Sequence, residues 1–211
     1  TGEGFSGDAI GYASWIMDCD SLRELTISED NPYYQSINGI IYSKDGKTIG
    51  PVPPAIPFDT VDFDGITAIG DFAFCCRESE KEFVIPQQIT SIGDYAFYGC
   101  CEDEYWEYHD EGVSVNIQLN EGLTSIGDYA FSNIGYLREM ELPDSLLTLG
   151  KAAFSSTSLE SMTIPSKVTV IPDSLFRECL SLETVILPEG ITEIGEYAFH
   201  GTTNLTKIQL P

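Results

Sequence analysis

A period of about 23 residues is the feature that most constrains how this chain can fold. Phenylalanines recur at nearly constant spacing, at Phe74, Phe97, Phe131, Phe154, Phe176 and Phe199. The intervals are 23, 34, 23, 22 and 23 residues, so one interval is 11 residues longer than the usual 23. A unit this short cannot bury its own apolar face, and neighbouring units must stack to form a continuous core. The period therefore predicts a solenoid.

Further columns of apolar residues accompany each phenylalanine. Eight residues before it lie Ile66, Ile89, Leu123, Leu146, Val168 and Ile191, and five before it lie Ile69, Ile92, Ile126, Leu149, Ile171 and Ile194. A glycine follows the second column in five units, and Pro172 takes its place once. Downstream segments such as SLETVILP at 181–188 alternate apolar and polar residues and end at proline, which predicts a short strand. Each unit is expected to supply one strand, a turn, a second short extended piece and a turn that carries the phenylalanine.

A column of acidic residues directly precedes the phenylalanine turns, at Asp71, Asp94, Asp128, Asp173 and Glu196. One interpretation is calcium binding, since calcium prefers several oxygen ligands. The favoured interpretation is that each carboxylate caps a short helical turn. Neither an EF-hand nor a glycine-rich calcium repeat is present in the sequence, so no metal site is predicted.

The whole unit, I-x-x-I-G-x-x-A-F-x-x-C-x-x-L-x-x-I-x-I-P, resembles the BspA-like class of leucine-rich repeat over six units at 63–211. This resemblance implies a single domain over 1–211, a right-handed leucine-rich repeat solenoid rich in short strands with short turns or 3-10 segments and little α-helix. Residues 10–28 fit a partial repeat, with Ile16 in the phenylalanine position. Residues 29–62 carry no repeat columns and are expected to form an inserted hairpin, with its turn at Asp45–Gly46, followed by a proline-rich return.

Three of the six cysteines, Cys19, Cys100 and Cys179, share one repeat column, where cysteine is expected to be a small buried residue. The pairs Cys75–Cys76 and Cys100–Cys101 lie in adjacent repeats. Free thiols, one disulfide between the pairs, and a zinc site are the three alternatives. The spacing of the pairs fits tetrahedral zinc poorly.

Charge and motifs narrow the function. The net charge of -24, from 34 acidic and 10 basic residues, opposes binding to nucleic acid or to anionic lipid. No apolar run is long enough for insertion into a membrane. Neither of the two histidines is flanked by a nucleophile at a matching repeat position, and no nucleotide-binding or metalloprotease motif occurs, so neither an enzyme nor a cofactor is expected. A carbohydrate-active enzyme is a less favoured alternative, because carboxylates are plentiful.

A first candidate binding surface consists of strand residues that point away from the core. It comprises Glu82, Asn116, Gln118, Glu139, Glu141, Thr163, Thr184 and Lys207. An exposed solenoid face of mixed polar residues suits a protein or glycan partner.

A second candidate lies in the one long interval, where an insertion at about 101–113 must loop out of the stack. It combines acidic residues, among them Glu104 and Glu107, with Tyr105, Trp106, Tyr108 and His109. The simplest interpretation is a solvated acidic loop. The alternative is a binding loop whose aromatic residues anchor a partner while the acids steer its approach. One histidine among flexible carboxylates gives at most a weak metal site.

The resemblance also implies a function. BspA-like proteins are exported or attached to the bacterial surface and take part in adhesion. The absence of an initiator methionine at Thr1 suggests a trimmed chain. We therefore expect an extracellular or cell-surface recognition module for a host or neighbouring-cell protein, with a glycan as the alternative ligand. A structural spacer in a larger surface protein is the competing hypothesis.

Overall fold

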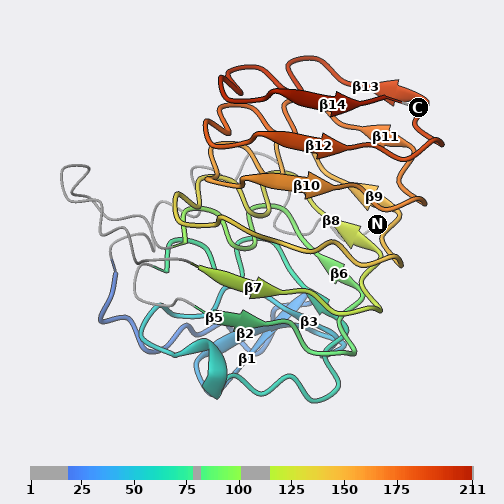
Figure 1. Ribbon diagram of the computed structural model, residues 1–211. Helices are drawn as coiled ribbons and strands as arrows, with labels where there is room; N and C mark the ends of the chain where they lie inside the picture. Colours follow the sequence, from blue (N-terminus) through green and yellow to red (C-terminus); the bar gives the residue numbers. More distant parts are fainter. Residues whose placement is uncertain (1–18, 78–81, 101–114, 211) are drawn as a thin grey trace.

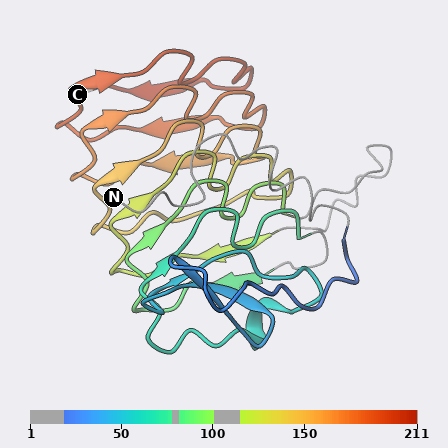
Figure 2. The same cartoon turned by 180° about the vertical axis from the view of Figure 1, so that it is seen from behind.

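The computed structural model describes residues 19–77, 82–100 and 115–210. The chain winds into a stack of coils made of short strands (Figures 1 and 2). The elements are β1 (Tyr34–Ile37), β2 (Ile40–Ser43), β3 (Thr48–Ile49), the 3-10 helix η1 (Phe58–Thr60), β4 (Ala68–Ile69), β5 (Glu82–Val84), β6 (Ser91–Ile92), β7 (Asn116–Gln118), β8 (Ser125–Ile126), β9 (Thr148–Leu149), β10 (Ser161–Thr163), β11 (Val170–Ile171), β12 (Thr184–Ile186), β13 (Glu193–Ile194) and β14 (Lys207–Gln209).

Two arrays of parallel strands run along the stack. The first contains the three-residue strands, paired as β5–β7 and as β10–β12–β14. The second contains the two-residue strands, paired as β3–β4–β6–β8–β9 and as β11–β13. The structure confirms the predicted solenoid of two extended pieces per unit, and η1 is the only helix in the described part of the chain.

A column of stacked phenylalanine rings forms the centre of the core. Successive ring centroids from Phe74 through Phe97, Phe131, Phe154 and Phe176 to Phe199 lie 5.4, 5.3, 5.8, 5.9 and 5.8 Å apart, with interplanar angles of 3° to 19°. All except Phe199 are fully buried. The 23-residue period thus places each ring directly against its counterpart in the next coil.

Two antiparallel hairpins precede the repeats. The predicted one joins β2 to β3, which pair at Tyr42 and Ile49, with Asp45 and Gly46 in a connection that is longer than the expected two-residue turn. A two-residue turn lies instead at Asn38–Gly39, which has φ of 52° and 80° and joins β1 to β2. In the connection between β2 and β3 the hydroxyl of Ser43 donates to Asp45 and accepts from the backbone N–H of Thr48, so a side chain replaces a closer backbone pairing.

Two aromatic residues near the proline-rich return belong to the core. Phe58 packs its ring 4.8 Å from Phe74 and 5.1 Å from Phe83, and Phe63 lies 5.5 Å from Phe58. Phe58 occupies a stretch to which the sequence assigned no repeat column. Its position shows that the core begins before the first clear repeat.

A buried arginine ties the same return to the first repeat. Arg77 donates hydrogen bonds to the carbonyl oxygens of Ile56, Val52 and Pro53 at 2.7, 3.3 and 3.1 Å. Its guanidinium also lies 5.2 Å from the centroid of the Phe74 ring. Backbone carbonyls and an aromatic face therefore receive this buried charge.

Two of the three column cysteines, Cys100 and Cys179, are buried as expected, whereas Cys19 is half-buried. The two buried thiols also form hydrogen bonds. Cys100 and Cys179 donate to the carbonyl oxygens of Phe74 and Phe154, one coil earlier, at 2.9 and 3.0 Å. Burial raises the pKa of the Cys179 thiol, which keeps it protonated as a donor. No disulfide joins two of the described cysteines, and Cys101 lies outside the described residues.

Strand pairing is interrupted at one junction in both arrays. Residues 139–141 do not form a strand, so the first array stops at β7 and resumes at β10. The second array stops at β9 and resumes at β11, where Pro172 follows the strand and has no N–H to donate. The N–H groups of Gly70, Gly93, Gly127 and Gly195 form this bond in their coils; that of Gly127, for example, donates to Ile92 at 2.8 Å.

Candidate functional site

The outward side chains of the three-residue strands form two aligned rows. The central residue of β5, β7, β10 and β12 is buried, whereas the flanking residues are exposed or half-buried. Strand register places Glu82 beside Asn116 and aligns Ser161, Thr184 and Lys207 in the first row. It places Val84 beside Gln118 and aligns Thr163, Ile186 and Gln209 in the second. We call these two rows the strand face.

The prediction of a strand at Glu139 and Glu141 is wrong. Both side chains are exposed and Met140 between them is buried, so the alternation persists without the ladder of backbone hydrogen bonds that makes a strand. The break coincides with the one 22-residue interval, in which Leu159 follows Phe154 after five residues instead of six. The repeat is one residue shorter between Phe154 and Leu159, in the turn that leads to β10.

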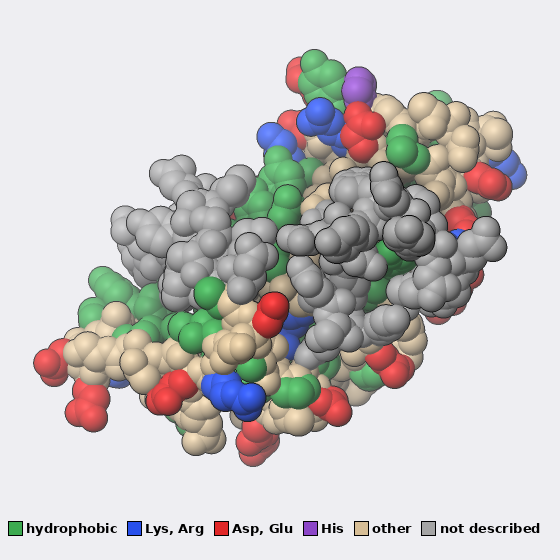
Figure 3. All heavy atoms as spheres, turned by 90° about the vertical axis from the view of Figure 1, so that its left-hand side faces the viewer, with side chains coloured by type: hydrophobic (Ala, Val, Ile, Leu, Met, Phe, Trp, Pro, Cys, Tyr) green, Lys and Arg blue, Asp and Glu red, His purple; other side chains and the backbone are tan. Residues whose placement is uncertain are grey.

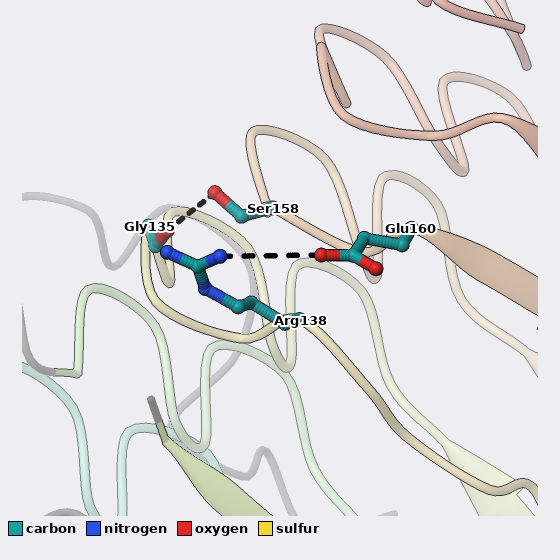
Figure 4. Close-up of polar contacts among 4 residues, drawn as sticks. All are labelled: Gly135, Arg138, Ser158 and Glu160. Carbon is teal, nitrogen blue, oxygen red and sulfur yellow. Dashed lines mark hydrogen bonds and ion pairs between the residues drawn. The ribbon is translucent and has the colours of Figure 1, made fainter. Parts of the chain in front are cut away.

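Polar contacts bridge the strand face at this break (Figure 4). The backbone N–H of Glu160 donates to the carbonyl of Arg138 at 3.1 Å, and the two side chains form an ion pair at 4.0 Å. The hydroxyl of Ser158 donates to the carbonyl of Gly135. Both charged side chains are well exposed, so the ion pair is worth about 0–1 kcal/mol.

The strand face contains apolar residues among the polar ones. Val84 and Ile186 have exposed fractions of 52% and 41%. Neither residue is among the binding residues predicted from the sequence. Their alternation with buried Phe83 and Val185 is the signal that identifies them.

A second surface feature follows the two-residue strands. It is a shallow groove of about 520 Å³, lined along the coils by Gly70, Gly93, Gly127 and Gly150 and by Asp71, Asp94 and Asp128. The glycines are there because coils approach closely. A Cβ added at Gly127 would lie 2.5 Å from Oδ1 of Asp94 and 2.6 Å from the carbonyl carbon of Gly93.

The acidic column in this groove does not cap helical turns, contrary to the favoured interpretation. Tyr95 and Tyr129, which follow the acids, have φ of 56° and 54°, so the chain does not enter a right-handed helix there. Oδ1 of Asp71 instead accepts a hydrogen bond from the N–H of Asp94, and Asp128 accepts one from Lys151. Each carboxylate thus links its coil to the next.

Burial raises the pKa of acidic and tyrosine side chains in and beside this groove. It raises the pKa of Asp71 and Asp94, with the carboxylate of the next coil adding to the increase and the backbone hydrogen bond opposing it. Burial, with neighbouring Tyr129 and acidic side chains, raises the pKa of Tyr95 to about 12. Tyr95 lies between Phe72 and Tyr129 in a second stack, at 5.0 and 4.8 Å.

No group of three or more His, Cys, Asp or Glu in the described ranges could hold a metal ion. Because the carboxylates of the groove accept backbone N–H groups, they act as links between coils. We assign the groove a structural role.

The surface is predominantly acidic. On the side shown in Figure 3, Asp and Glu side chains are spread over the visible described surface, whereas Lys and Arg appear at few places. The loop residues predicted for binding, Glu104, Tyr105, Trp106, Glu107, Tyr108 and His109, lie outside the described residues.

One buried polar residue was missed by the sequence analysis. Asn120 stands where most other repeats have the proline that ends the strand, as at Pro86 and Pro143. Its amide nitrogen donates to the carbonyls of Pro86 and Ile89 at 2.8 and 2.9 Å, and its amide oxygen accepts from Gly122 at 2.6 Å. The signal in the sequence was an asparagine at a position where most other repeats have proline.

Comparison with known families agrees with this geometry. The profile of the BspA type leucine rich repeat region matches residues 67–110 and 108–211, in six copies. The chain belongs to this family. A comparison with curated proteins found no match.

Solved bacterial leucine-rich repeat proteins have similar folds. The T. pallidum protein TpLRR is 24% identical with a TM-score of 0.66, over 88% of this chain and 81% of that one. A protein from Bacteroides ovatus is 26% identical with a TM-score of 0.59, over 86% of this chain and 46% of the other. A leucine rich cell surface protein from Faecalibacterium prausnitzii is 23% identical with a TM-score of 0.50, over 92% and 43%. This chain therefore spans less than half of the latter two.

Membership defines the general class of the molecule. Leucine-rich repeats generally mediate protein–protein interaction and are generally not enzymes, so this BspA-type chain is a repeat interaction module. In the described ranges, no helix has the length and apolar character required to cross a bilayer.

Proposed function

We propose that this BspA-type repeat module is a non-enzymatic adhesion module that binds a protein partner through its strand face. The observation that carries the proposal is the register of the strands. It aligns exposed polar and apolar side chains over successive coils, while the residues between them hold the core. A partner can therefore contact many outward residues without disturbing the packing.

The chemistry of the face favours a protein ligand. Exposed Val84 and Ile186 provide apolar contact area among amides, hydroxyls and charges, which is the mixture that protein interfaces use. A glycan is the alternative ligand. The acidic surface favours partners with basic patches, because long-range attraction accelerates their encounter.

We place the module outside the cell or on its surface. The proposal rests on its family and on the structural likeness to a leucine rich cell surface protein. The loop at 102–111, with Tyr105, Trp106 and Tyr108, is proposed as a second contact site on the strength of its acidic and aromatic composition.

The test compares binding to immobilised extracellular-matrix proteins and to a glycan panel at physiological salt. One variant carries Asn116→Arg and Gln118→Arg on β7. Its matched control carries Thr148→Arg and Val170→Arg, which are exposed residues on the other array. A third variant replaces 102–111 with a short Gly/Ser link. Circular dichroism checks that each variant folds.

Loss of binding in the β7 variant alone supports the strand face. Loss only in the loop variant moves the site to the loop and overturns the strand-face assignment. Absence of saturable binding by every form, to proteins and glycans alike, favours the spacer hypothesis. Turnover of a glycan would replace the adhesion proposal with a carbohydrate-active enzyme.

A further inference from the structure

In the part of the chain that the structure describes, no strand covers one edge of β5. Its sheet contains only β5 and β7, which pair in parallel. The N–H of Ile85 donates to the carbonyl of Gln118, so the backbone groups of Phe83 and Ile85 face β7. Because these groups alternate along a strand, those of Glu82 and Val84 face the opposite edge. The described residues on that side include 57–63, and no backbone hydrogen bond joins them to β5.

A groove of about 440 Å³ lies along this open edge. Phe58 and Phe63 contribute to one wall, and Val84 and Pro86 to the other. The ring of Phe58 is held by Phe74 and Phe83, so the wall belongs to the packed core. The groove is therefore a preformed, mainly apolar depression beside backbone groups of β5 that form no hydrogen bond with another described residue on that side.

The charge of the groove is of one sign. Asp59 and Glu82 line it, and the described lining includes no Lys or Arg. An occupant with Lys or Arg side chains is complementary to this lining. A second copy of the chain is not, because two molecules with a net charge of -24 repel one another.

We propose that the β5 edge binds an extended segment of a partner protein in which apolar residues alternate with Lys or Arg. The segment adds a strand beside β5, with its backbone pairing to Glu82 and Val84. Its apolar side chains enter the groove, and its basic side chains reach Asp59 and Glu82. Strand addition of this kind takes its affinity from main-chain bonds and its specificity from alternate side chains.

This inference deepens the proposed adhesion function, since it names the partner's chemistry and one binding edge. It is tested apart from the matrix panel. Binding to the panel without binding of a peptide leaves the adhesion proposal standing and removes the β5 edge. Binding of a peptide without binding to the panel keeps the β5 edge as a binding site and removes support for the adhesion proposal.

The probe is a fluorescein-labelled peptide, Lys-Val-Lys-Val-Lys, blocked at both ends and measured by fluorescence anisotropy at low and physiological salt. Its controls are Glu-Val-Glu-Val-Glu and a Lys-Val-Lys-Val-Lys peptide N-methylated at every residue, which removes the N–H groups from both edges of the added strand in either orientation. We expect saturable binding of the first peptide only, weakened by salt.

Protein variants separate backbone from side-chain contributions. Val84→Pro removes the N–H that faces the open edge and keeps the groups that pair with β7, since proline is tolerated at a free strand edge. Loss of one hydrogen bond should weaken binding roughly ten-fold. Val84→Ala keeps the N–H and should weaken it less. A double variant, Asp59→Lys with Glu82→Lys, should abolish the salt-dependent part and serves also if Val84→Pro does not fold.

Three results would overturn the proposal. They are equal affinity for the acidic peptide, unchanged affinity after N-methylation, or full binding by a folded Val84→Pro variant. Self-association through β5, detected as a dimer that Val84→Pro converts to a monomer, would assign the edge to a second copy instead.

Discussion

Oδ1 of Asp94 accepts a hydrogen bond at 2.7 Å from the backbone N–H of Asp128, 34 residues further along the chain. Asp128 occupies the same column in the next coil, and the 11 extra residues of the long interval do not disturb the link. In a later coil, Oδ1 of Asp173 accepts the equivalent hydrogen bond from the N–H of Glu196 at 2.7 Å. The acidic column, for which calcium binding was one interpretation, is thus a ladder between coils.

Replacing Asp94 separates its hydrogen bond from its charge. Asp94→Asn keeps an oxygen acceptor, whereas Asp94→Ala leaves the N–H of Asp128 without this partner and should cost about 1–3 kcal/mol of unfolding free energy. Chemical denaturation of both variants at neutral pH measures the difference. Equal stability of the alanine variant and the parent would show that the ladder contributes nothing.

The raised pKa of Asp94 predicts how its contribution depends on pH. Because the folded state binds the proton more tightly, this group favours folding below the ordinary Asp pKa of about 3.9. That contribution is lost as pH rises through the higher folded-state pKa. The stability of the parent relative to Asp94→Asn should therefore fall between pH 3 and pH 7. Exposed Asp144→Asn is the control, and an identical change in slope for the two variants would contradict the prediction.

Phe131 tests the ring column. It is fully buried between Phe97 and Phe154, so Phe131→Ala should cost about 3–5 kcal/mol. Phe199 has one stacked neighbour and is only half-buried, so Phe199→Ala should cost less. Thermal melting compares the two. A smaller effect at Phe131 than at Phe199 would mean that the centre of the stack does not depend on its rings.

Gly127 tests the close approach of coils. A Cβ there would overlap the backbone of Gly93 and Asp94, and Gly127→Ala should destabilise by about 1–3 kcal/mol. At Gly135 nothing lies within 4 Å of an added Cβ, which makes Gly135→Ala the matched control. Urea denaturation should separate the two variants, and similar midpoints would show that the coils move apart without cost.

Asn120 tests a buried amide. Asn120→Asp replaces the amide donor with a carboxylate that faces the carbonyls of Pro86 and Ile89, whereas Asn120→Ala only removes the bonds. The aspartate variant should therefore be the less stable at neutral pH, since a buried charge without donors is costly. Differential scanning calorimetry at neutral and acidic pH checks this order. At acidic pH the difference in stability between the two variants should become smaller, because the carboxylate is protonated.

Much of the fold could be predicted because a repeat repeats its packing. Once Phe74 and Phe97 share a column, the same contact is expected at every later phenylalanine, and the structure confirms the solenoid. Alternation in SLETVILP similarly fixed which side of β12 faces the core, with Val185 buried and Ile186 exposed.

The features that were missed depend on contacts between coils, which a single unit does not encode. The role of the Asp94 carboxylate depends on the N–H of Asp128 and on the positive φ of Tyr95, neither of which has a signature in the local pattern. The segment at 139–141 alternates polar and apolar residues as a strand does, so its sequence does not reveal that it forms no strand. The open edge of β5 follows from how 57–63 packs, and no repeat column reports it.

At the junction beside Pro172, backbone hydrogen bonds join the coils more fully on one side of the stack than on the other. Both strand arrays are interrupted there, while Ala152, Phe154 and Ser156 still donate to Asp173, Leu175 and Arg177 at 2.8 to 3.1 Å, and the rings of Phe154 and Phe176 remain stacked. A backbone ladder therefore joins the coils on the side of the rings, whereas on the strand face the contacts of Ser158 and Glu160 replace the strand pairing. A ligand that spans β7 and β10 would add contacts on the side of the junction where the coils share fewer backbone hydrogen bonds.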